Sequence, residues 1–521
     1  MRLARFSVFL LGAASSALAG VTVQKPGLTI PAEYTSQETA AKQLFSTSYD
    51  AYKQFAWGHD DLLPVSLGVG DGLGGWGASL VDALGTLWIA GETDEFEEAV
   101  NFIANLDFST PPVPQTISVF ETTIRWVGGL VSAYELSGEQ YPILITKAKE
   151  VTDKLAFAFF GNNTIPFNQM DFTTNKPLNQ TTNIAQIGTL SLEWGALSKY
   201  TGNATYGQLT ENAAIAVAEL AAPLPGLAPQ VVDPNTGKFA DADSYFEYLI
   251  KFGRYTNNAN PIFIDTWKTA VDSSITHLLK TSTVGNFSYL ADFDDSGRIR
   301  HVGSHLACFY AGNWLLGGQL LQNQTIIDIA LDLNEGCWNT YASTATGIGP
   351  EGFAFISADG NFTGGSSISA SQLAFYNKHG YYITSSDYIQ RPEVLESNFY
   401  AWRVTGDTKY LDRAASAIAS FNKFLPAKVA FAGLNDVNNV NGGLIDDMES
   451  FWFAEVLKYL VLTFDDPSHI SLDDYVFNTE CHPLKAPPAL DSYAAKLVPA
   501  KKYTPPATTA PRPAVSPRPQ Q

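Results

Sequence analysis

The chain has 521 residues, of which 45% are hydrophobic and 16% are charged, so it can bury a large core and is not a disordered protein. Its formal net charge of −20 excludes a surface that attracts nucleic acid or anionic membranes. Such an acidic surface suits a neutral substrate.

Residues 1–19 have the pattern of a secretory signal peptide. Arg2 and Arg5 precede the apolar and small-residue stretch 6–19, and the sequence Ala-Leu-Ala at 17–19 fits the small-x-small cleavage rule. The alternative is an uncleaved anchor, but the stretch is short for a span of about 20 residues. With no C-terminal retrieval motif, we predict a secreted protein without a stable membrane anchor, and the Golgi lumen as the second choice.

Cysteines and glycosylation sequons agree with that route. An odd cysteine count in an oxidising compartment predicts one disulfide and one unpaired thiol. Six Asn-x-Ser/Thr sequons lie downstream of the signal. The cysteines are Cys308, Cys337 and Cys481, and the sequons are at Asn162, Asn179, Asn203, Asn286, Asn323 and Asn361.

The rest of the chain divides into three segments. Residues 20–34 predict an extended lead-in, and residues 497–521 form a Pro-rich tail that cannot build a core and is expected to be disordered. Residues 35–496 contain no linker that would split them. Because so long a single domain is unusual, we expect a repeat architecture.

Helical periodicity supports such a repeat, and strand-like alternation is confined to the connections. A glycine that ends one helix, followed by an aromatic residue that opens the next, recurs at Gly91, Gly138, Gly202 and Gly406. We therefore predict an all-α fold, an (α/α)7 barrel of seven helical hairpins with short β segments in the connections. The fourteen predicted helices span 35–57, 76–90, 94–106, 117–138, 141–160, 184–202, 205–222, 242–256, 261–282, 306–321, 324–344, 391–406, 408–425 and 448–464.

The even-numbered helices are apolar and carry isolated carboxylates, so we expect them to line the barrel. One buried carboxylate is usually structural, paired with a cation or a backbone donor. Several carboxylates that converge can raise one another's pKa values, so that one acts as an acid and another as a base. The same arrangement of negative charge is also typical of a cation-binding site. The carboxylates are Asp82, Glu121, Glu193, Asp243, Glu393, Glu396 and Glu455.

Other catalytic classes lack their motifs. The sequence has no G-x-S-x-G nucleophile elbow, no H-E-x-x-H or paired-cysteine zinc motif, and no G-x-x-x-x-G-K-[ST] loop. The glycine-rich stretch 68–75 follows no clear strand and predicts a loop. Carboxylates combined with 12% aromatic residues favour carbohydrate hydrolysis, in which two acids flank the scissile bond.

Ten stretches in order resemble the class I α-1,2-mannosidases of glycoside hydrolase family 47, in their fungal secreted or Golgi-like form. The resemblance spans about residues 36–482, and it implies an (α/α)7 barrel with calcium-dependent, inverting removal of terminal α-1,2-linked mannose from high-mannose N-glycans. The stretches are AWGHDDLLPVS (56–66), GGWGASLVDAL (74–84), FETTIRWVGGLVSAYELSG (120–138), TNIAQIGTLSLEW (182–194), ADSYFEYLIK (242–251), SHLACFYAG (304–312), GIGPEGF (347–353), RPEVLESNFYAWRVTGD (391–407), MESFWFAEVLKYLVLTFDDP (448–467) and SLDDYVFNTECHP (471–483).

The resemblance implies three catalytic acids. Glu121 in FETTIR matches the general acid, Asp243 in ADSY matches a second essential acid, and Glu393 in RPE matches the general base. Which of Glu121 and Asp243 donates the proton stays open. Inversion implies carboxyl groups roughly 6.5–9.5 Å apart. The structural alternatives are an ion pair of Glu121 with Arg125, and a helix-start position for Glu393.

The same resemblance implies a Ca²⁺ ion. Thr479 in FNTE would offer its hydroxyl and carbonyl oxygens, and carboxylates would hold the waters that complete the shell. The ion would orient mannose hydroxyls. The water-holding acids are Glu193, Glu396, Glu455 and Glu480, and further substrate-site residues are Arg125, His305, Arg391 and Phe451.

The family's disulfide corresponds to Cys308 and Cys337, and its loop of about 30 residues is worth about 3 kcal/mol. Cys481 replaces the usual alanine and is expected to be a buried thiol. Gly85 and Gln186 replace usual acids. Asp241 stands where enzymes that remove a single mannose carry arginine, which favours removal of several mannoses. None of these departures touches the catalytic acids or Thr479, so we predict an active enzyme.

Two alternatives remain. A weakly active or inactive paralogue could use the same barrel as a lectin in glycoprotein quality control, and another (α/α) enzyme, such as a glucan hydrolase, would use a different acid pair. Retention of the three acids and Thr479 favours the enzyme. The expected partner is a high-mannose oligosaccharide or glycoprotein, with no nucleic acid, and we expect a monomer.

Overall fold

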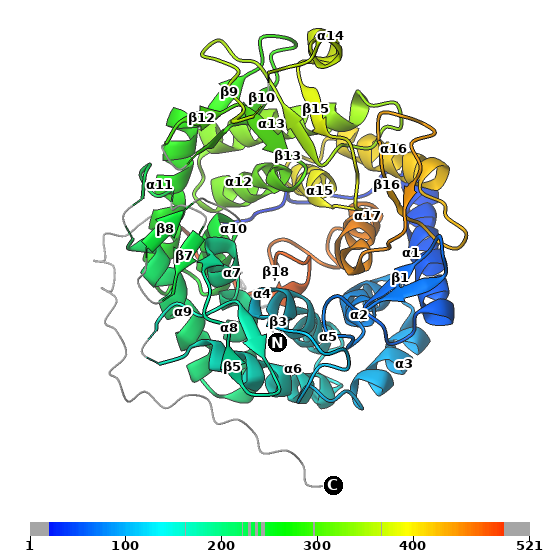
Figure 1. Ribbon diagram of the computed structural model, residues 1–521, viewed down its shortest axis with the longest axis vertical. Coiled ribbons are helices and arrows are strands. Elements are labelled where there is room, and N and C mark those ends of the chain that lie inside the picture. The colour runs from blue at the N-terminus through cyan, green and yellow to red at the C-terminus, as the bar shows by residue number, and fades with distance from the viewer. Residues whose placement is uncertain are drawn as a thin grey trace, which may run out of the picture.

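The computed structural model describes residues 20–161, 163–220, 222–227, 231–234, 238–240, 245–294, 297–365 and 367–493. In these residues two concentric rings of helices surround a central axis (Figure 1). Each inner helix contacts the next, and α17 contacts α2, which closes the ring. The inner helices are α2 (Ala78–Ala90), α5 (Gly128–Leu136), α8 (Ser191–Thr201), α10 (Tyr245–Tyr255), α12 (Phe309–Leu320), α15 (Glu393–Thr405) and α17 (Leu457–Phe464). The outer helices are α1 (Thr35–Phe55), α3 (Thr93–Ile103), α6 (Pro142–Leu155), α9 (Thr205–Ala218), α11 (Ile262–His277), α13 (Gln324–Ala342) and α16 (Lys409–Phe424).

The predicted (α/α)7 barrel is confirmed. The fourteen ring helices of the described residues match the fourteen predicted ones, and every inner helix matches an even-numbered prediction. Inner helices such as α15 and α17 are buried on nearly all sides, whereas outer helices such as α1 and α16 bury one face. The difference arises because an inner helix is covered both by the outer ring and by side chains that fill the barrel.

Three predicted inner helices are interrupted. The helix predicted at 117–138 begins as α4 (Val119–Thr122), continues through the π-helical segment η2 (Thr123–Val127) and ends as α5. The helix predicted at 448–464 contains a second π-helical segment, η5 (Trp452–Val456). A short helix, α7 (Ile184–Gly188), precedes α8. A 3.6-residue period cannot reveal a π turn, which is wider than an α turn. The 3-10 turns are η1 (Ala32–Tyr34), η3 (Ala156–Ala158) and η4 (Leu306–Cys308).

The predicted glycine junctions are confirmed. Gly91, Gly202 and Gly406 cap α2, α8 and α15 in the left-handed conformation, with φ of 86°, 68° and 66°. Gly138 also has positive φ, two residues beyond the end of α5. Glycine adopts this conformation without a steric penalty, so the chain can reverse sharply into the next outer helix.

Short antiparallel strands lie in the connections, as predicted. The hairpin β18–β19, whose turn carries Thr479, lies near the barrel axis and contacts α10 and α5 (Figure 1). The paired strands are β1 (Asp61–Leu63) with β2 (Gly68–Gly70), β3 (Ile117–Ser118) with β4 (Gln169–Asp171) and β5 (Lys176–Pro177), β6 (Thr182–Asn183) with β7 (Val231–Asp233) and β8 (Lys238–Ala240), β9 (Leu279–Thr281) with β10 (Ser288–Leu290), β11 (Asp292–Phe293) with β12 (Ile299–Arg300), β13 (Val302–Ser304) with β14 (Gly352–Ala354) and β15 (Tyr382–Ser385), β16 (Gly433–Leu434) with β17 (Leu444–Ile445), and β18 (Tyr475–Phe477) with β19 (Pro483–Lys485).

One helix was not predicted. α14 (Ala370–His379) lies outside the rings, where Tyr376 joins a small second core with Tyr289, Phe353 and Tyr381. Tyr376 is the one buried side chain described in α14, so the sequence of this helix shows no apolar periodicity from which the helix could be predicted. The capping box of Ser369 and Gln372 was the available signal. Among the described residues, no helix combines the length and the apolar character that a membrane span requires.

The lead-in 20–34 is irregular apart from η1, and the Val21 N–H donates to the Leu490 carbonyl over 2.8 Å. The two ends of the described chain therefore lie side by side. The predicted signal peptide 1–19 and tail 497–521 lie outside the described residues, and the domain limits stay predictions.

Candidate active site

Glu121 lies in the first turn of α4. The Ser118 hydroxyl accepts a hydrogen bond from its N–H, and Arg125 donates to its Oε2 from Nε at 3.0 Å and Nη2 at 2.8 Å. The ion pair considered as the structural alternative is therefore present. The Glu121 side chain is nevertheless 32% exposed, so the carboxylate is both paired and open to a substrate or a water.

The buried guanidinium of Arg125 connects Glu121 to the rest of the site. Its Nη1 contacts Glu480, donates to Ser450 Oγ at 2.9 Å and lies 3.5 Å from Asp82 Oδ2. Its Cζ is 5.6 Å from the ring centroid of Phe451, a cation–π distance. Burial opposes the charge of Arg125, but the three carboxylates outweigh burial and raise its pKa. The single guanidinium of Arg125 is therefore shared by three carboxylates.

Glu393 is the first residue of α15, so the helix-start position predicted for it is confirmed. His305 Nδ1 hydrogen-bonds Glu393 Oε2 over 2.8 Å, and His305 Nε2 hydrogen-bonds the Tyr341 hydroxyl over 2.8 Å. Arg391 Nη1 lies 3.8 Å from Glu393 Oε1. Burial alone would raise the pKa of Glu393, but the hydrogen bond with His305 and the nearby positive charge of Arg391 help to outweigh burial and lower it. Glu393 therefore stays ionised, as a general base must.

Thr479 lies in the turn between β18 and β19, half-buried between the buried Asn478 and Glu480. Its N–H donates to the Tyr248 hydroxyl at 3.2 Å, and that hydroxyl donates to Glu193 Oε1 at 2.6 Å. Asn478 Nδ2 donates to the same Glu193 oxygen at 2.8 Å. The turn is therefore fixed to α8 and α10 by polar side chains.

Four buried carboxylates, which we call the crowded acids, come from the elements around this turn. Burial raises the pKa of Glu193 to about 7 and that of Glu396 to about 8. Burial and neighbouring carboxylates raise the pKa values of Glu455 and Glu480 well above their usual range. The crowded acids are Glu193, Glu396, Glu455 and Glu480.

The residues present fit a hard divalent cation. Glu193 Oε2 is buried without a hydrogen-bond partner. Thr479 offers oxygen atoms that could bind a metal ion, and the crowded acids beside it supply negative charge. Within the described ranges, no three His, Cys, Asp or Glu side chains converge as direct metal ligands. A cation here would take oxygens from Thr479 and from waters held by the crowded acids.

Several contacts of the site were missed by sequence reasoning. Asn478 lies inside the FNTE stretch, but an asparagine in a turn has an ordinary structural explanation. Lys251 forms a buried pair with Glu247 one turn earlier on α10, and its Nζ lies 3.7 Å from Glu396 Oε1. The spacing of four residues was an available signal for this pair. Ser450 and Tyr341 carried none.

The departures from the family pattern have structural explanations where the chain is described. Gln186 keeps a capping box with Asn183 at the start of α7, so an amide replaces the acid there without loss of the cap. At Gly85, a Cβ would lie 3.4 Å from Lys458 Nζ. Lys458 is buried, which lowers its pKa, and it donates instead to the Cys481 carbonyl at 2.9 Å.

The cysteine predictions are confirmed. Cys308 and Cys337 form a disulfide that joins the start of α12 to α13, and Cys481 is a buried free thiol. Among the sequons, Asn203 is half-buried, and Asn179, Asn286, Asn323 and Asn361 are exposed, so glycosylation there stays a prediction.

Asp243, Asp241 and Asn162 lie outside the described residues. The structure therefore does not place the second predicted acid. The separation of 6.5–9.5 Å expected between acid and base also stays a prediction.

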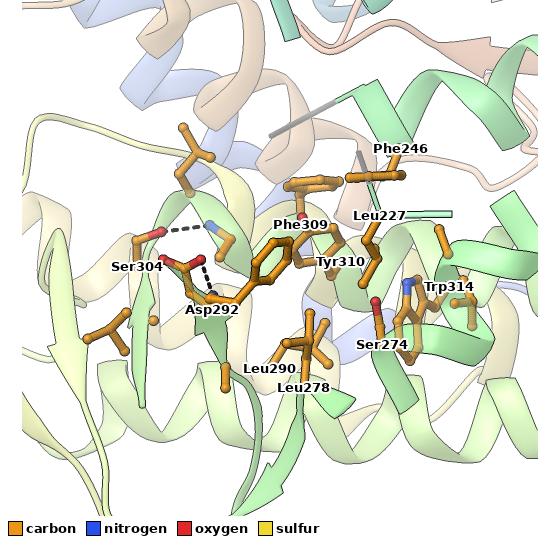
Figure 2. A pocket seen from close by; sticks show the side chains of 18 of the residues that line it. Leu227, Phe246, Ser274, Leu278, Leu290, Asp292, Ser304, Phe309, Tyr310 and Trp314 are labelled. Carbon is orange, nitrogen blue, oxygen red and sulfur yellow. Dashed lines mark hydrogen bonds between the residues drawn. The ribbon is translucent and has the colours of Figure 1, made fainter. Parts of the chain in front are cut away.

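A separate cavity of about 310 Å³ lies between α11, α12 and the strands β10–β13 (Figure 2). Its lining includes the aromatic residues Phe309, Tyr310 and Trp314, and Asp292 and Ser304 add polar groups. None of the predicted acids or Thr479 lines this cavity. The chemistry of the side chains, rather than the cavity, therefore places the candidate active site.

Comparisons with known proteins identify the family. The sequence pattern of glycosyl hydrolase family 47 matches residues 44–486. Mannosyl-oligosaccharide alpha-1,2-mannosidase 1B of Aspergillus phoenicis is 38% identical over 480 residues, which cover 86% of this chain and 91% of that protein. The protein of the same name from Emericella nidulans is 39% identical, covering 86% and 93%. The solved structure of the alpha-1,2-mannosidase from Trichoderma reesei superposes with a TM-score of 0.83 at 37% identity, covering 87% of this chain and 99% of that one.

Proposed function

This chain belongs to glycosyl hydrolase family 47, and we propose that it is a calcium-dependent α-1,2-mannosidase that trims terminal mannose from high-mannose N-glycans with inversion. The relatives named mannosyl-oligosaccharide alpha-1,2-mannosidase support the reaction and the linkage. The signal-like residues 1–19 and the sequons support a secreted enzyme.

The observation that carries the proposal is the bridge through Arg125. This residue contacts Glu121 on one side and Glu480, the neighbour of Thr479, on the other. A predicted general acid and a predicted cation turn, which lie more than 350 positions apart in the chain, thus share one guanidinium. A purely structural glutamate would need neither the exposure of Glu121 nor this connection.

In the proposed reaction, each residue of the site has its own role. Glu393, kept ionised by His305, takes a proton from the attacking water. Glu121 protonates the leaving oxygen, directly or through a water, and Asp243 is the alternative donor. Phe451, which is 9% exposed beneath Arg125, offers a ring for the mannose to pack against. When bound through Thr479, calcium would orient the mannose hydroxyls and offset the charge of the crowded acids.

The test uses the purified full chain with an α-1,2-linked dimannose, in calcium or in excess chelator. We expect mannose release in calcium only, and NMR should detect β-mannose as the first product. The α anomer would refute inversion, and release that continues in chelator would refute the calcium requirement. No release in calcium, together with retained glycan binding, would favour the lectin alternative. Defined N-glycans would then show whether several mannoses are removed, as Asp241 suggests.

A further inference from the structure

Both π-helical segments occur on inner helices, and both carry residues of the candidate active site. η2 contains Arg125, and η5 contains Glu455 and follows Phe451. Single π turns inside α-helices are rare and concentrate at functional sites. Two of them, on the inner helices on either side of α2, therefore call for a physical account of what keeps them in this form.

Each π segment leaves one backbone carbonyl unused at its end. The Gly128 N–H donates to the carbonyls of Thr123 and Arg125 and passes over that of Ile124. The Leu457 N–H donates to the Trp452 carbonyl, five residues earlier, and passes over that of Phe453. A buried carbonyl without a partner costs free energy, so an isolated π turn would tend to revert to an α turn.

A buried side chain from another element occupies each unused carbonyl. Asn478 Nδ2 donates to the Ile124 carbonyl at 3.0 Å, and Thr86 Oγ1 donates to the Phe453 carbonyl at 2.8 Å. Thr86 and Asn478 are both fully buried. The same arrangement thus occurs twice, with a different donor residue each time.

The donors belong to elements that already touch the site. Thr86 lies one turn after Asp82 on α2, and Asp82 accepts a hydrogen bond from Ser450 Oγ at 2.6 Å. Asn478 precedes Thr479, and its Oδ1 accepts the N–H groups of Glu480 at 3.0 Å and His482 at 2.7 Å. The π turns are therefore coupled to α2 and to the Thr479 turn.

We propose that Thr86 and Asn478 are positioning residues that hold η5 and η2 in the π form and so aim Glu455 and Arg125 into the site. An α-helix advances each residue by about 100°, so the loss of a π turn would rotate the side chains on one side of it by a similar angle. This inference rests on the proposed function for its kinetic consequences, but not for the backbone geometry itself.

The main test is Thr86→Val, which keeps the shape of the side chain and removes the hydroxyl. We expect kcat to fall about tenfold and the calcium Kd, measured by titration calorimetry, to rise about tenfold, as for other residues that orient a metal site from behind. Thr86→Ser, which keeps the hydroxyl, should restore both values to within about twofold.

Thr463→Val is the matched control. Thr463 is also buried, on α17, but its hydroxyl donates to the Tyr459 carbonyl of its own helix at 2.7 Å. We expect this variant to lose thermal stability without changing kcat or the calcium Kd. Equal kinetic effects of the two valine variants would overturn the proposal, because a merely structural loss would then explain both.

Crystal structures of the wild type and of Thr86→Val separate this inference from the proposed function. We expect residues 452–456 to relax towards an α turn in the variant. A π turn that persists unchanged, with unchanged kinetics, would overturn the role of Thr86. A wild type without mannosidase activity or calcium binding would instead refute the proposed function and leave the structural test standing. Should Thr86→Val not fold, Thr86→Cys, a weaker donor of similar size, is judged by the same criteria.

Discussion

Two sets of carboxylates in the same barrel differ in their surroundings. Glu121 and Glu393, which we call the paired acids, each have a cationic or hydrogen-bonding partner directly on the carboxylate. The crowded acids around Thr479 also have partners, such as Arg125 on Glu480 and Tyr248 on Glu193, but burial outweighs these contacts and raises their pKa values. Both sets come from inner helices or from the β18–β19 turn, so the difference lies in burial and in how far the partners offset it.

This contrast indicates two different roles for the carboxylates, proton transfer and cation binding. An acid that must exchange protons needs a route to the substrate, which the partly exposed Glu121 has. A group of buried carboxylates that repel one another stores unfavourable energy that a bound cation relieves. We infer that the paired acids serve the chemical step and that the crowded acids serve the cation, and three experiments test that division.

The largest effect is expected at a paired acid. Glu393→Gln keeps the shape of the side chain but removes the base, so kcat should fall about 10³-fold with little change in KM. Glu135→Gln is the matched control. Glu135 is also a buried acid on an inner helix, but its partner is Tyr200, which donates a hydrogen bond to it at 2.6 Å, instead of His305. Initial rates on the α-1,2-linked dimannose measure both. A variant at Glu393 that keeps a tenth of the activity would contradict the assignment.

The crowded acids predict how stability depends on pH. Their pKa values are raised in the folded state, so their contribution is complete below the usual glutamate range near 4.5 and is lost as pH rises through about 7 for Glu193 and about 8 for Glu396. In chelator, the melting temperature should therefore fall by a few degrees between pH 6 and 8.5. Calcium favours the ionised carboxylates and should remove most of that fall.

His482 does not contribute to the change in melting temperature between pH 6 and 8.5. Burial lowers the pKa of His482 to about 4, so this residue stays neutral above pH 6. Differential scanning fluorimetry across the pH series, with and without calcium, makes the comparison. A melting temperature that rises with pH in chelator, or a fall that calcium leaves unchanged, would mean that the crowded acids do not form a cation site.

The sequence predicted the barrel because each hairpin repeats a local pattern, apolar periodicity closed by a glycine such as Gly202. It predicted the acids because a carboxylate in an apolar helix, such as Glu193, is conspicuous without its partners. It could not predict the partners, since Arg125 meets Glu480 only after the chain has closed the ring. The π turns were also beyond reach, because their stabilising donors, Thr86 and Asn478, lie far away in the sequence. The role of Thr479 came from the family resemblance alone.

The smallest effect is expected at one of the crowded acids, and its sign is distinctive. Glu193→Gln keeps an oxygen to accept from Tyr248 and Asn478 while it removes one buried charge. In chelator at pH 8 the variant should be more stable than the wild type by about 1 kcal/mol, because burial of that charge is no longer required. Its calcium Kd should rise about tenfold, since one anion behind the bound waters is lost.

Glu121→Gln provides the matched comparison from the paired acids. Removal of that charge leaves Arg125 with two carboxylates instead of three, so the variant should gain no stability in chelator. It should instead lower kcat with the calcium Kd unchanged. Chemical denaturation in chelator and titration calorimetry measure both variants. If Glu193→Gln, like Glu121→Gln, gains no stability in the calcium-free protein, the two sets of acids do not differ in kind, and the separate roles proposed for them are wrong.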